Sequence, residues 1–134
     1  MDFSHNEPMT IRSQFQPTVD EFISTLNDFA TGSYLKAEEK EFWDQPFNPK
    51  VLPELKSILE KMLDSFDALD DDPTEEDLVK VAQRWVDKLL EFNARHADAV
   101  IEPEEKEELG ELIREAAAAT GAEESALAEL PELD

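Results

Sequence analysis

The stretch TEEDLVKVAQRWVDKLLEF (residues 74–92) decides the fold class, because its apolar residues recur with the period of an α-helix. Thr74 is a favoured N-cap residue, and the acids that follow it suit the positive end of a helix dipole. The apolar positions cover roughly half of a helical wheel: Leu78, Val79, Val81, Ala82, Trp85, Val86, Leu89, Leu90 and Phe92. So wide an arc predicts a central helix that packs on two neighbours.

Polar residues on the other half of this helix predict ion pairs on its surface. Glu76 precedes Lys80 by four residues, and Glu91 precedes Arg95 by four. An acid placed four residues before a base is the favourable order for such a pair. We therefore expect both pairs to form within the helix.

Two helices are expected before this stretch. The first begins after Pro17, where Thr18 and Glu21 have the spacing of a capping box, and it ends at Gly32. Another begins near Pro53 and carries a continuous apolar stripe: Leu55, Ile58, Leu59, Met62, Leu63, Phe66 and Leu69. Between them, residues 33–43 favour a short helix with a poor apolar pattern.

A last main helix is predicted from about Pro103 to Ala119, with Gly121 just beyond its end. No stretch shows the alternation of a β-strand. The chain of 134 residues is thus expected to form an all-α, single-domain helical bundle of four main helices plus a short extra helix. We divide it into an extended N-terminal arm (1–16) anchored by Phe3, Ile11 and Phe15, a helical domain (17–121) and a mobile acidic tail (122–134).

The charge balance restricts the partners of this protein. Asp and Glu number 34 against 12 Lys and Arg, and the net charge is −22. Nucleic acids and anionic lipid surfaces would repel such a chain. The sequence has no cysteine, no long apolar run and no basic segment followed by an apolar one near its start. These features predict a soluble, cytoplasmic protein that does not bind membranes or nucleic acid directly.

Three kinds of reactive site can be tested against the sequence, and none fits. A calcium loop starting at Asp70 would have Glu75 in place of the required glycine and Val81 in place of the bidentate glutamate. A di-iron bundle needs two Glu-x-x-His pairs, but neither His5 nor His96 has a glutamate three residues earlier. Serine and threonine occur mainly at caps and turns, without a nucleophile motif. We therefore expect no enzyme activity, metal or cofactor, and a half-buried, hydrogen-bonded His96.

Acidic residues on the last helix are the best candidates for a binding surface. Glu104, Glu108, Glu111 and Glu115 recur at intervals of four, three and four, opposite the leucine face. A second acidic patch is formed by Asp70, Asp71, Asp72 and Glu75. In composition the chain is similar to immunity proteins, DNA-mimic inhibitors and antitoxins, with no shared motif. These patterns favour a non-catalytic protein, an inhibitor or adaptor, that binds a basic partner protein.

Two other functions agree with the same sequence. The domain could be a structural or regulatory one whose acidity serves solubility. It could also be a small-molecule binder or enzyme with a pocket lined by Trp85, Phe92 and Trp43. The sequence does not indicate an oligomeric state.

Overall fold

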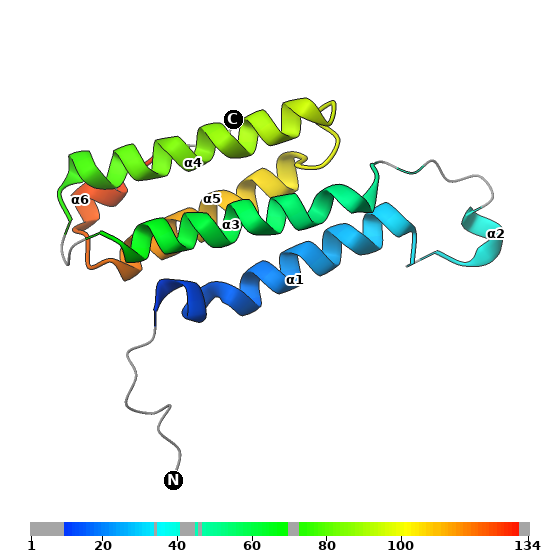
Figure 1. The fold of residues 1–134 in the computed structure, drawn as a ribbon, viewed down its shortest axis with the longest axis horizontal. Coiled ribbons are helices and arrows are strands. Elements are labelled where there is room, and N and C mark those ends of the chain that lie inside the picture. Colours follow the sequence, from blue (N-terminus) through cyan, green and yellow to red (C-terminus); the bar gives the residue numbers. More distant parts are fainter. Residues whose placement is uncertain (1–9, 34, 41–44, 46, 70–72, 132–134) are drawn as a thin grey trace, which may run out of the picture.

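The computed structural model describes residues 10–33, 35–40, 45, 47–69 and 73–131, and within these ranges all regular structure is helical. The all-α prediction is confirmed. The four long helices run roughly parallel or antiparallel to one another, with short elements at their ends (Figure 1). The helices are α1 (Ile11–Thr31), α2 (Ala37–Lys40), the 3-10 turn η2 (Pro49–Val51), α3 (Leu52–Asp67), α4 (Glu75–Arg95), α5 (Pro103–Ala119) and α6 (Glu124–Leu127).

The central helix is α3, and not α4 as the sequence predicted. Helix α3 contacts α1, α4 and α5 (Figure 1). Helix α4 packs on two neighbours as predicted, which are α3 and the short α6. The C-terminal segment of the chain therefore covers part of the wide apolar side of α4. Trp85, predicted to lie at the centre of that arc, is buried with 6% of its surface exposed.

Helix α1 begins eight residues before its predicted start, because its N-cap is Thr10 and not Thr18. Residues 1–9 of the predicted arm, with Phe3, lie outside the described residues. The prediction of an extended arm over residues 1–16 is therefore wrong from Ile11 onward, and Pro17 lies inside the helix. Ile11 and Phe15 are buried in the same helical register as the later apolar residues of α1, which are Val19, Phe22, Leu26 and Ala30. Burial of this extended stripe favours helix despite the proline.

The core is a continuous cluster of side chains from all four long helices. Helices α3 and α4 contribute equal numbers of fully buried residues, and Phe66, Leu26, Phe92 and Leu109 represent the four helices in the cluster. The apolar stripe predicted for residues 55–69 supplies the α3 part of it. Because each helix has one apolar side, its opposite side is left for charged residues.

The turn between α4 and α5 is fastened by one buried amide. The Asn93 side chain donates to the Ile101 carbonyl at 2.8 Å and accepts from the Ile101 amide at 2.8 Å. Within this turn Ala97 and Asp98 have φ angles of 59° and 58°, the left-handed region that non-glycine residues rarely adopt. The paired bonds of Asn93 hold the reversal that brings α5 back along the bundle.

Residues 122–131 pack against the bundle. The prediction of a mobile tail is therefore wrong for this part of the chain. Helix α6 contacts both α4 and α5. Ala126 is buried, and Leu127 and Leu130 pack against the core. These three apolar residues pack against the core where α6 contacts α4 and α5, and their burial offsets the acidity of the tail.

Only one of the two predicted pairs on α4 forms. Lys80 Nζ lies 3.2 Å from Glu76 Oε1, as expected. Arg95 instead reaches α3, where its guanidinium donates to Glu54 Oε2 at 2.9 Å. The short helix predicted for residues 33–43 is represented by α2 alone in the described residues. No helix in the described ranges is both long and apolar enough to cross a membrane.

Candidate functional site: an acidic groove between α1 and α5

A groove of about 300 Å³ runs between α1 and α5, and carboxylates border it on both sides. Glu21 belongs to α1, while Glu108, Glu111 and Glu115 belong to α5. The remaining lining residues are Thr18, Phe22, Thr25, Leu109 and Leu112. We call this set the acidic groove.

Helix periodicity explains why these residues meet. Residues 108, 111, 112 and 115 follow one another at intervals of three, one and three, so their side chains lie on one side of α5. Thr18, Glu21, Phe22 and Thr25 have the same spacing on α1, which contacts α5. Phe22, Leu109 and Leu112 are buried and form the floor. The glutamates and threonines are exposed and form the walls.

The carboxylates of the groove are not neutralised within the described chain. The described ion pairs join Arg12 with Glu60 and Asp64, Lys56 with Asp20, Lys80 with Glu76, and Arg95 with Glu54. None of them involves a glutamate of the acidic groove. Four like charges around one concave surface raise the local concentration of cations there.

Glu105 is a buried carboxylate near the start of α5. Its side chain is 9% exposed and accepts a hydrogen bond from the Glu102 amide at 3.2 Å, as part of a capping box. Burial raises the pKa of Glu105, and the nearby carboxylates of Glu102, Glu104 and Glu108 raise it further, while the bond from the Glu102 amide lowers it. Burial, more than the neighbouring charges, therefore disfavours the ionised form of Glu105.

The predicted site residues have different outcomes. Glu108, Glu111 and Glu115 come together in the acidic groove, whereas Glu104 is exposed on α5 and does not line it. The prediction that this stripe lies opposite the leucine face is wrong, because Leu109 and Leu112 line the same groove between the glutamates. Glu75 is exposed in the first turn of α4 and does not line the groove either. The rest of the second patch, Asp70, Asp71 and Asp72, lies outside the described residues.

Sequence reasoning misses the α1 wall of the groove. The spacing of Thr18 and Glu21 indicates a capping box, but both residues lie well inside α1, and neither caps it. Their spacing with Phe22 and Thr25 is the signal that marks the wall. The spacing predicts a wall of the groove only when the true start of α1 and the packing of α1 on α5 are known.

Other expected chemistry can be compared with the structure. In the part of the chain that is described, no three His, Asp or Glu side chains are grouped to hold a metal ion. Trp85 and Phe92 are buried in the core and do not line the acidic groove, and Trp43 lies outside the described residues. His96 follows α4, half-buried as expected, with its ring 4.7 Å from that of Phe92. Its Nε2 is buried without a hydrogen-bond partner, contrary to the prediction.

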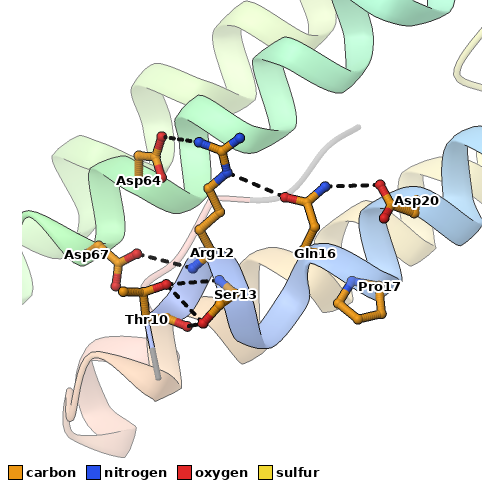
Figure 2. Close-up of a pocket in the computed structure, with 8 residues that line it drawn as sticks. All are labelled: Thr10, Arg12, Ser13, Gln16, Pro17, Asp20, Asp64 and Asp67. Carbon is orange, nitrogen blue, oxygen red and sulfur yellow. Dashed lines mark hydrogen bonds and ion pairs between the residues drawn. The ribbon is translucent and has the colours of Figure 1, made fainter. Parts of the chain in front are cut away.

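A second, more open hollow of about 520 Å³ lies where α1 begins and α3 ends. Figure 2 shows its lining residues, whose polar groups bind one another. The polar groups around this hollow already bind one another. They are therefore less available to a ligand than the carboxylates of the acidic groove, which are unpaired in the described chain.

Comparison with models of protein families, with curated proteins and with solved structures finds no match to this chain.

Proposed function

We propose that this domain is a non-catalytic binding protein that holds a basic partner protein at the acidic groove. The observation that carries the proposal is the arrangement of Glu21 opposite Glu108, Glu111 and Glu115 across an apolar floor, with no described basic residue in the lining. A surface that only served solubility would not need its acids gathered on two helices around one concavity.

The chemistry of the groove matches lysine and arginine side chains. Their aliphatic stems can lie over Phe22 and Leu112, while the charged ends bind the carboxylates of the walls. The floor residues are already buried in the fold and offer little apolar area. Charge is therefore expected to supply most of the association rate and specificity, and binding should weaken as salt rises.

The proposed partner is a protein with a basic segment, for example a helix with lysine or arginine on one face. Nucleic acid and anionic lipid are disfavoured because the net charge of −22 repels phosphate. An inhibitor or adaptor that covers the basic surface of another protein would work in this way. Glu104 and Glu75 would then add to long-range attraction without contacting the partner.

The test compares two triple variants with the same change in net charge. The groove variant carries Glu108→Lys, Glu111→Lys and Glu115→Lys. The control carries Glu91→Lys, Glu107→Lys and Glu129→Lys, three exposed acids outside the groove lining. A partner is first captured from a host extract with the unaltered protein, identified and purified. Its affinity for all three proteins is then measured at low and high salt.

The expected result is a loss of about 100-fold or more in affinity for the groove variant, because juxtaposed like charges cost several kcal/mol. The control should lose much less, through weaker long-range attraction. Equal losses in the two variants would show that overall charge, and not the groove, attracts the partner. That outcome would remove the acidic groove as the binding site.

A further inference from the structure

The first turns of α1 are joined to the rest of the helix through a weak point. Pro17 has no amide hydrogen, so it cannot donate the helical bond that the Ser13 carbonyl would accept. Residues 11–16, which we call the strap, are thus less firmly tied to the helix than an uninterrupted turn would be. The polar contacts that join the strap to another helix in the described structure lie on α3.

Asp67 is the principal contact of the strap. Its Oδ1 accepts the Ile11 amide at 2.7 Å. Its Oδ2 accepts the Arg12 amide at 3.1 Å, the bond from Asp67 that Figure 2 draws. Asp67 is the last residue of α3, where the helix dipole disfavours a negative charge. The free amides at the start of α1 are where a carboxylate is favoured. Asp67 thereby satisfies the amides of Ile11 and Arg12, and the positive end of α1 to which they belong offsets the repulsion between its charge and the dipole of α3.

Side chains extend the same contact along α3. The Arg12 guanidinium donates to Asp64 at 3.1 Å and lies 3.5 Å from Glu60. Gln16 donates to Glu60 at 3.0 Å and to Asp20 at 3.0 Å, and the bond from Gln16 is the largest cause that lowers the pKa of Asp20. Below these polar groups, Ile11 and Phe15 are buried against the core.

We propose that the strap is an electrostatic latch that opens as a unit about Pro17 while the rest of the bundle stays folded. Closed, it places the Arg12 guanidinium beside Glu60 and Asp64 and two backbone amides on Asp67 at the end of α3. Open, it exposes Ile11 and Phe15 and leaves these carboxylates free for another cation. This device is separate from the acidic groove, whose α1 residues all follow Pro17.

Native-state hydrogen exchange read by NMR tests the latch with two variants of opposite effect. Asp67→Asn removes the charge that binds the strap, and Pro17→Ala restores the missing helical bond. The reporters are the amides of Phe15 and Gln16, because both donate within α1 and do not touch Asp67 directly. Asp87→Asn is the matched control, since Asp87 is an exposed acid on α4 that binds only Gln83 among the described contacts.

In Asp67→Asn, exchange at Phe15 and Gln16 should be about tenfold faster, which corresponds to the loss of one hydrogen bond to a charged group. Exchange in the middle of α4 should not change. Pro17→Ala should slow exchange at the two reporters, and Asp87→Asn should leave them unaltered. If Asp67→Asn speeds exchange equally in α1 and α4, the strap does not open separately and the proposal fails. If Pro17→Ala has no effect, the hinge is refuted.

Discussion

At the scale of single residues, Trp85 has a large buried indole ring whose own N–H lacks a hydrogen-bond partner in the described structure. Its Nε1 is buried and makes no hydrogen bond in the described structure. Arg84 and Lys88 lie 5.6 Å and 5.5 Å from the ring centroid and cover it from solvent. A buried donor without an acceptor costs about 1–3 kcal/mol, which offsets part of what the ring contributes.

This balance predicts different effects for two substitutions of Trp85. Trp85→Ala should lower the free energy of unfolding by about 3–5 kcal/mol through lost burial and a cavity. Trp85→Phe should change it by less than about 1.5 kcal/mol, because most of the ring stays and the unpaired donor is removed. Urea denaturation of both variants measures the difference. Equal losses would contradict this account of the indole.

Glu105 provides a second prediction at this scale. The pKa of Glu105 is raised in the folded state, so the folded protein binds a proton there more tightly than the unfolded chain does. The ionised carboxylate therefore lowers the free energy of unfolding at neutral pH, and this loss disappears as pH falls through the raised pKa. Glu105→Gln keeps an acceptor for the Glu102 amide and removes the charge. The variant should be more stable than the unaltered protein at pH 7 and equal to it under acidic conditions. A variant less stable at pH 7 would show that the charge is needed.

At the scale of elements, the ends of helices limit how much of the fold the sequence predicts. The periods of α3, α4 and α5 and the Thr74 cap follow from local patterns, and the structure confirms them. The predicted start of α1 is wrong because Pro17 and Thr18 form a convincing local signal. The residue that stabilises the true start is Asp67, far away in sequence. Such a contact has no local signature.

The docked tail is the other element that local patterns do not reveal. Leu127→Ala with Leu130→Ala should lower the free energy of unfolding by about 2–4 kcal/mol, since both side chains are partly buried against the core. The control, Glu123→Gln with Glu129→Gln, changes only exposed side chains of the same segment and should cost little. Thermal unfolding distinguishes the two. Equal melting temperatures for the leucine variant and the unaltered protein would mean that the tail does not stabilise the bundle.

The candidate site shows the same division between local and distant information. The spacing of Glu108, Glu111 and Glu115 is sufficient to place them on one side of a helix. Their grouping with Glu21 depends on α1 lying beside α5, a consequence of tertiary packing. Glu104 shares the stripe but lies beyond the part of α5 that faces the groove.

At the scale of the whole molecule, the net charge of −22 is opposed by few ion pairs, and those described are on the surface. Salt should therefore weaken the repulsion between the acidic residues more than it weakens the ion pairs. Added sodium chloride should raise the melting temperature. The variant with Glu91→Lys, Glu107→Lys and Glu129→Lys should melt higher than the unaltered protein at low salt and depend less on salt. A melting temperature that falls with added salt would show that attractive pairs dominate.

The measurement that tests the central claim most directly is an NMR titration of the isotope-labelled protein. The probe is a short amphipathic peptide of lysine, arginine and leucine. If the acidic groove holds basic partners, amide shifts at low salt should concentrate at Glu21 and Phe22 and across residues 108–115, and they should fade at high salt. Shifts spread evenly over the acidic surface, or centred on the start of α4 at Glu75, would contradict the claim.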